Sequence, residues 1–111
     1  MNTTVKTINV AGRELPVKYG VNALNELCKK WNVSFNDFGS LMEKFTLDQM
    51  LDVVFVGLKY GHKRAGVEFT IKPEDVGDMF DDHFNKIVEF VQLFGTSLSV
   101  EENALPQGGG E

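Results

Sequence analysis

The chain contains a single cysteine, Cys28, and only two histidines, His62 and His83, among its 111 residues. One cysteine cannot form an internal disulfide, which favours a protein of a reducing cytoplasm. We interpret Cys28 as a small core residue and not as a nucleophile, because free cysteines are commonly buried. The two histidines lack the spacing of zinc ligands, so the sequence predicts no metal and no cofactor.

Long apolar runs and an excess of positive charge are also missing. No apolar run approaches the roughly 20 residues that a membrane-spanning helix needs, and the N-terminus lacks the pattern of a secretory signal. The formal net charge is −5. Because nucleic acids and anionic membranes attract cationic surfaces, the sequence predicts neither as a partner.

Motifs that carry catalysis are missing from the sequence too. The segment 61–66 has the glycine spacing of the first half of a P-loop, but Val67 and Glu68 stand where phosphate binding needs Lys and then Ser or Thr. The acids of 74–82 lack the alternation and the central glycine of a calcium loop. No Ser/His/Asp or Cys/His set is recognisable, so we expect a protein that is not an enzyme.

The composition that is present fits one globular domain. Hydrophobic residues make up 42% of the chain, which is enough for a core without disulfides or metal. The patterns predict a mainly α (α+β) fold over residues 1–98, followed by a flexible tail over 99–111. The expected elements are a β-hairpin at 5–19 and helices at about 21–31, 35–43, 47–65, 73–80 and 83–98.

The helix at 47–65 is predicted to be the central, buried one. Thr46 and Gln49 have the spacing of a capping box, and Gly66 is a plausible helix stop. Gly57 and Gly61 allow another backbone to approach closely. We expect that approach to come from within the domain and not from a second copy.

The hairpin is predicted from alternating apolar residues at Ile8, Val10, Leu15 and Val17. A two-residue type II′ turn at 12–13 would pair Val10 with Leu15 and Ile8 with Val17 on one face. Pro16 cannot donate a ladder hydrogen bond, so its strand is expected at a sheet edge. A lone ribbon is marginal in water, so its apolar face must pack on helices or on another chain.

The last predicted helix, at about 83–98, is apolar. Its helical spacing predicts a main buried stripe, which Phe90 and Leu93 widen. The stripe consists of Phe84, Ile87, Val88, Val91, Phe94 and Leu98.

One group of side chains is a candidate for partner binding. Cations gather near the end of the central helix and contrast with the acids of 74–82, an asymmetry that suits pairing between copies or with a partner. The alternative is that both groups are ordinary solvated helix ends. The candidate residues are Lys59, His62, Lys63 and Arg64.

An ordered series of phrases over residues 5–98 resembles the tail assembly chaperones of long-tailed, siphovirus-like bacteriophages and prophages. The phrases are TINVAGRELPVKYGVNALNELCKKWNVS, then DVVFVGLKYGHKRAGVEFT, and then PEDVGDMFDD before a final apolar helix. The most distinctive part is LKYGHKRAG, which ends a hydrophobic helix before EFT.

The resemblance implies a non-catalytic assembly factor of the bacterial host cytoplasm that is absent from the mature virion. Such proteins bind the tape-measure protein, help recruit subunits of the major tail (tube) protein, and tend to self-associate. In many phages a translational frameshift adds a C-terminal domain that contacts the tube protein, and a flexible tail would be a suitable joint for it.

Two other interpretations share the composition. One is a small cytoplasmic adaptor or regulatory protein-interaction domain unrelated to phages. The other is a nucleic-acid binder that uses the cations of 59–64. Such a binder would lose affinity steeply with salt, and the overall acidity of the chain disfavours it.

Overall fold

The computed structural model describes residues 4–104, with side chains up to residue 98. The observed class agrees with the prediction of a mainly helical domain with an N-terminal β-hairpin. Short 3₁₀ turns, Phe35–Asp37 and Pro73–Asp75, open α2 and α4. The elements are β1 (Lys6–Val10), β2 (Arg13–Val17), α1 (Val21–Trp31), α2 (Phe38–Met42), α3 (Leu47–Ala65), α4 (Val76–Met79) and α5 (Phe84–Ala104).

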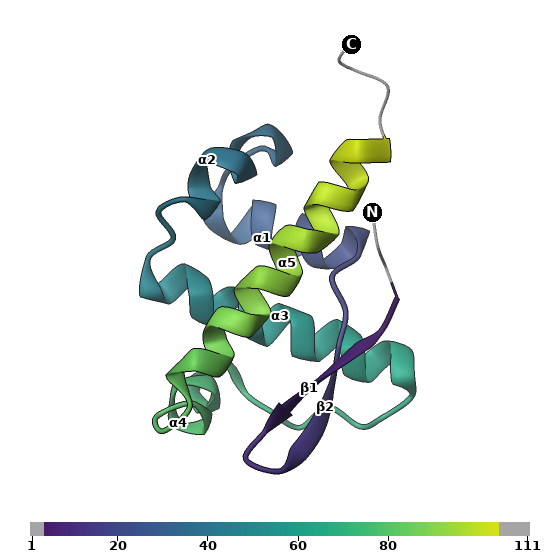
Figure 1. Cartoon of the computed structure of the whole chain (residues 1–111), viewed down its shortest axis with the longest axis vertical. Coiled ribbons are helices and arrows are strands. Elements are labelled where there is room, and N and C mark those ends of the chain that lie inside the picture. Colours follow the sequence, from purple (N-terminus) through teal and green to yellow (C-terminus); the bar gives the residue numbers. More distant parts are fainter. Residues whose placement is uncertain (1–3, 105–111) are drawn as a thin grey trace.

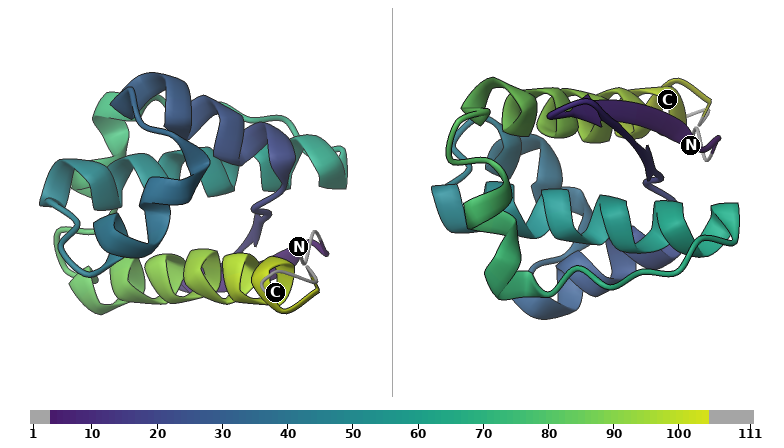
Figure 2. Two further views of the ribbon diagram at one scale, coloured as in Figure 1. Left: turned by 90° about the horizontal axis from the view of Figure 1, so that it is seen from above. Right: turned by 90° about the horizontal axis from the view of Figure 1, so that it is seen from below.

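Helix α3 is the centre of the arrangement. Both views in Figure 2 place it between α1 on one side and α5 on the other. The hairpin lies across α3 and α5, with β2 against α3 and β1 against α5 (Figure 1). The apolar face of the hairpin is therefore covered by helices of the same chain.

Local sequence signals set the ends of α3. The amide of Thr46 donates to Gln49 Oε1 at 2.9 Å, and the amide of Gln49 donates to Thr46 Oγ1 at 3.2 Å. This capping box satisfies amides that the first turn leaves free. Gly66 ends the helix in the left-handed region with φ of 75°, a conformation that glycine adopts without steric cost.

Helix α5 runs to Ala104, beyond the predicted end at Leu98. Residues 99–104 contain no proline or glycine, so nothing in this segment prevents the helix from continuing. The first helix-breaking residue after it in the sequence is Pro106. The predicted tail, 99–111, thus includes six residues that continue α5. Its remaining part, 105–111, lies outside the described residues.

The hairpin register corrects the predicted turn. The two-residue loop is Ala11-Gly12, not 12–13, and Ile8 pairs with Leu15. Both loop residues have positive φ, 53° and 84°, the combination of a type I′ turn instead of type II′. The slip is by two residues, and a shift of two leaves every side chain on its original face. The apolar alternation therefore places the four apolar side chains on one face in either register, although in the observed one Val10 pairs with Arg13 and Val17 pairs with Lys6.

Replacing Ala11 with asparagine is expected to stabilise the domain by about 0.5–1 kcal/mol, because alanine is strained at positive φ and Asn-Gly is favoured in type I′ turns. Urea unfolding measures the change. The matched control is Ala65→Asn in the last turn of α3, where φ is helical and asparagine has the lower propensity. Equal effects of the two substitutions would contradict the turn assignment.

Helix α3 and strand β2 approach each other at the level of their backbones. A Cβ atom at Gly61 would collide with the main chain of Pro16 and Val17, and one at Gly57 would collide with the ring of Tyr19. The amide of Lys18 donates to the carbonyl of Gly57 at 3.1 Å. The prediction that this glycine pair packs within the domain is confirmed.

An aromatic cluster fills the space between α5 and the other helices. Phe94 is fully buried, and its ring centroid lies 5.2 Å from that of Tyr19, 5.6 Å from Phe38 and 6.4 Å from Phe45. Trp31 contacts Phe38 and Phe45 edge-on. Trp31 thus packs against the core from the end of α1.

Candidate functional site

Of the four predicted contact residues, two make contacts inside the domain and two are exposed at its surface. Lys59 lies along the interface between α1 and α3, where its Nζ is 3.0 Å from Glu26 Oε1. The hydroxyl of Tyr60 donates to the same oxygen at 2.8 Å. Two turns earlier in α3, Asp52 accepts from Lys30 Nζ and from Trp31 Nε1, each at 2.8 Å. Lys59 therefore has a structural partner inside the domain.

His62 is a core residue. Only 5% of its surface is exposed, and its Nδ1 lies 2.7 Å from the carbonyl oxygen of Leu58, so this nitrogen carries the proton and donates. Its ring faces that of Phe69, with centroids 5.2 Å apart. A partner at the surface would meet little of this side chain.

Lys63 and Arg64 are accessible to a binding partner. Both are exposed in the last turn of α3. No ion pair to either of them forms among the side chains that the structure describes. These two cations are therefore the part of the predicted group that a partner can reach.

The contact of Glu26 affects how stability depends on pH. Partial burial opposes ionisation of Glu26, but hydrogen bonds from Lys59 and Tyr60, together with the charges of Lys59 and Lys30, outweigh it and lower its pKa. The folded state thus binds this proton more weakly than the unfolded state. The stabilisation is present above the usual carboxyl value of 4.5 and is lost as the pH falls through the lowered pKa.

Replacing Glu26 with glutamine is expected to lower the free energy of unfolding by about 0.5 kcal/mol at pH 7, a small value because the pair is part-exposed. At pH 3 the difference from the parent chain should shrink, because the unfolded chain binds a proton at Glu26 below pH 4.5 while the folded chain, with its lowered pKa, binds that proton more weakly. Urea unfolding at both pH values tests this. Glu68→Gln, an exposed residue in a loop, serves as control, and an equal loss at both pH values would contradict the argument.

The acidic residues of 74–82 stay at the surface. Glu74, Asp75, Asp78, Asp81 and Asp82 are all exposed. Asp75 accepts from the amide of Lys72 at 3.2 Å and so caps the turn before α4. None of the five forms an ion pair within the described part of the chain.

Large apolar side chains are also exposed, and sequence reasoning missed them as surface residues. Phe84 and Val88 were predicted in the buried stripe of α5, yet they are 54% and 40% exposed. Phe90, predicted at the margin of that stripe, is fully buried. The excess width of the stripe was the available signal, because one helix face cannot bury so many residues. The other exposed apolar residues are Val21, Phe35, Leu47 and Val67.

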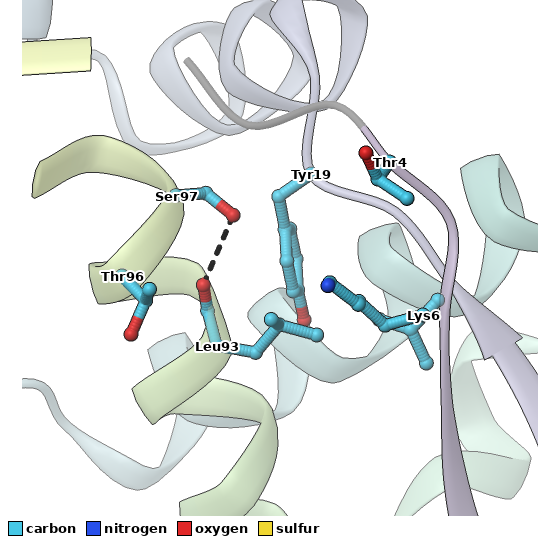
Figure 3. Close-up of a pocket in the computed structure, with 7 residues that line it drawn as sticks. Thr4, Lys6, Tyr19, Leu93, Thr96 and Ser97 are labelled. Carbon is cyan, nitrogen blue, oxygen red and sulfur yellow. Dashed lines mark hydrogen bonds between the residues drawn. The ribbon is translucent and has the colours of Figure 1, made fainter. Parts of the chain in front are cut away.

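A small hollow lies between the start of β1 and the second half of α5 (Figure 3). Its volume is about 100 Å³, room for a few water molecules. The hydroxyl of Ser97 donates to the carbonyl of Leu93 at 3.0 Å, and that of Tyr19 donates to the carbonyl of Val53 at 2.7 Å. Burial raises the pKa of Tyr19 well above its usual value. Both hydroxyls are therefore committed to the fold.

Among the side chains of residues 4–98, no three His, Cys, Asp or Glu groups gather in a way that would hold a metal ion. No helix within residues 4–104 has the length and apolar character needed to cross a membrane.

Comparisons of the chain with protein-family models, with curated proteins and with solved structures return no match.

Proposed function

We propose that this protein is a non-catalytic tail assembly chaperone of a long-tailed bacteriophage or prophage, acting in the cytoplasm of the bacterial host. In this role it binds the tape-measure protein, keeps its apolar helices from aggregating, and helps to recruit subunits of the major tail protein. It leaves before the virion is mature.

The observation that carries the proposal is the exposure of large apolar side chains on an acidic domain. Leu47 and Phe84 are each 54% exposed, and Val88 lies one turn after Phe84 on the same face of α5. Exposed apolar helix faces are the usual docking sites for amphipathic helices. The resemblance of the phrases over 5–98 supplies the identity of the client.

The test is co-expression with the tape-measure candidate of the same locus, followed by light scattering on the soluble fraction. We expect the long protein to become soluble only together with this chain, in a complex of many copies. A client that stays insoluble, with this chain eluting as a monomer, would overturn the proposal and favour an adaptor of another partner.

The double variant Phe84→Ser/Val88→Ser sharpens this test. It should solubilise much less of the client, because it removes the apolar contact without opening the core. The matched control is Phe35→Ser, which changes a side chain that is 43% exposed on the turn before α2. Equal loss with the control would contradict a specific role of the α5 face.

A further inference from the structure

The hairpin has a covered edge and an open one. Pro16 has no N–H, so it cannot exchange hydrogen bonds with Thr7, its partner in the ladder. Pairs that do and do not exchange hydrogen bonds alternate along an antiparallel ladder, so Asn9 and Glu14 form a second pair that does not. The main-chain N–H and C=O groups of Thr7 and Asn9 therefore point away from β2, along the outer edge of β1.

Helix α3 covers the edge of β2. The amide of Lys18 donates to the carbonyl of Gly57 at 3.1 Å, and the carbonyl of Pro16 lies against Gly61. In the part of the chain that the structure describes, no hydrogen bond from outside the hairpin reaches the main chain of β1. Figure 2, in its right view, shows β1 beside α5 at the outside of the molecule, with β2 leading from it toward α3. Unpaired main-chain groups of an exposed strand are a template to which an extended segment of another chain adds.

Lys6 places a positive charge on the inner face of the same strand. Side chains alternate along a strand, so Lys6 shares its face with Ile8 and Val10, which are both buried. Figure 3 shows its amino group pointing into the hollow between the hairpin and α5, beside Tyr19 and Leu93. No ion pair to Lys6 forms among the side chains that the structure describes.

The hollow suits a carboxylate better than a neutral group. Its volume of about 100 Å³ is room for the end of one short side chain. The hydroxyls of Tyr19 and Ser97 donate to main-chain carbonyls, so neither has a proton left for a ligand. The ammonium group of Lys6 has only donors, and a negatively charged acceptor therefore complements it.

Two acidic side chains near the hairpin have other partners. Glu14, on the outer face of the hairpin, accepts from Asn9 Nδ2 at 2.7 Å, and Glu89 pairs with Lys86 at 2.9 Å. The charge of Lys6 is thus left for a group from another molecule. An exposed ion pair adds little to binding by itself, so Lys6 selects among segments that the open edge of β1 holds.

We propose that β1 binds an extended segment of a different protein as a third strand, with a carboxylate of that segment against Lys6. Main-chain hydrogen bonds to Thr7 and Asn9 hold the added strand, and its acidic side chain enters the hollow beside α5. The residue two positions from the acid lies on the same face, beside Ile8, and is apolar. The partner is therefore an extended stretch in which an acidic and an apolar residue share one face.

Hydrogen exchange of the whole chain, followed by nuclear magnetic resonance, tests the strand addition. The probes are three short peptides of alternating threonine and valine, in which one central valine is replaced by glutamate, by glutamine or by lysine. At saturation with the glutamate peptide, the amides of Thr7 and Asn9 should exchange at least about tenfold more slowly, because they then donate to the added strand. The amides of Ile8 and Val10 donate within the hairpin without peptide and serve as the internal reference.

Comparison of the three peptides tests the role of Lys6. The glutamate peptide should bind about fivefold more tightly than the glutamine peptide, and the lysine peptide should bind most weakly. The chain carries a net charge of −5, so non-specific attraction would favour the lysine peptide instead. Lys6→Glu should reverse the order of the glutamate and lysine peptides. Lys29→Glu, the same change of charge at an exposed position of α1, should leave the order as it is.

Three results would overturn the proposal. One is unchanged exchange of Thr7 and Asn9 at about 1 mM peptide. Another is equal affinity of the three peptides, which would remove Lys6 from the site. The third is slow exchange of both amides without peptide that depends on protein concentration, which would assign the edge to a second copy. The test needs no tape-measure protein and leaves Phe84 and Val88 unchanged, so its failure is distinct from failure of the proposed function.

Discussion

Replacing Gly61 with alanine is expected to lower the free energy of unfolding by about 3 kcal/mol. The added methyl would meet the carbonyl group of Pro16 and the Cα of Val17. A flexible side chain can turn away from such a contact, but these atoms are backbone within a strand that pairs with β1. Relief therefore requires β2 to move off α3 and the buried residues of the hairpin to lose their packing.

Gly39→Ala is the control for that experiment. Gly39 is also helical, and a Cβ atom there would meet nothing within 4 Å. Alanine should raise the free energy of unfolding by about 0.5–1 kcal/mol at this position, because it restricts the unfolded chain and favours a helix. We expect urea unfolding to show changes of opposite sign in the free energy of unfolding, a loss for Gly61→Ala and a gain for Gly39→Ala. A loss of less than 1 kcal/mol at Gly61 would contradict the close approach of β2.

Replacing Phe94 with alanine is expected to lower the free energy of unfolding by about 4 kcal/mol. The ring of Phe94 is fully buried and contacts three other aromatic rings, those of Tyr19, Phe38 and Phe45. Its removal leaves a cavity between α5, α2 and the segment after β2. Large rings with fixed neighbours cannot collapse into such a space, so most of the loss should persist.

Phe35→Ala is the matched comparison for Phe94. Phe35 makes one ring contact, with Phe38 at 6.1 Å, and is 43% exposed. Its truncation should cost less than about 1 kcal/mol, because little buried area is lost. Thermal unfolding of the two variants side by side measures the difference. Similar costs at the two positions would show that the aromatic cluster is packed differently.

Both experiments also bear on the proposed contacts between molecules. Gly61 and Phe94 lie inside the domain, so their substitution should change binding only by unfolding the chain. Phe84, Val88 and Lys6 lie at the surface, so their substitution should change binding while the midpoint of unfolding stays nearly constant. Measuring stability and association on each variant separates the two causes.

Helix boundaries were the part of the fold that local sequence determined best. The bounds of α1 and α3 agree with the predicted ranges 21–31 and 47–65. The ends of α3 are set by a capping box and a left-handed glycine, and α1 ends at a left-handed asparagine, Asn32. Such caps act through hydrogen bonds within a few residues, which the sequence displays directly. The end of α5 was less well predicted, because composition alone suggested a tail where no residue forbids the helix.

The hairpin register and the surface of α5 depended on contacts between distant residues. Alternation with period two could not distinguish registers that differ by two residues. Whether Phe84 or Phe90 faces the core depends on how α5 is rotated against α3, and no residue near either one encodes that angle. The sequence shows which residues are apolar. Which of them face the core and which face solvent depends on the elements that pack against α5.

The candidate site shows the same division. Sequence alone determined a small, acidic, mainly helical domain with a group of cations at the end of its central helix. Only the tertiary structure decided that Lys59 is held by Glu26, that His62 is buried against Phe69, and that Lys63 and Arg64 stay exposed. Charge is a property of a residue and can be read from the chain, whereas its availability depends on partners brought near it by folding.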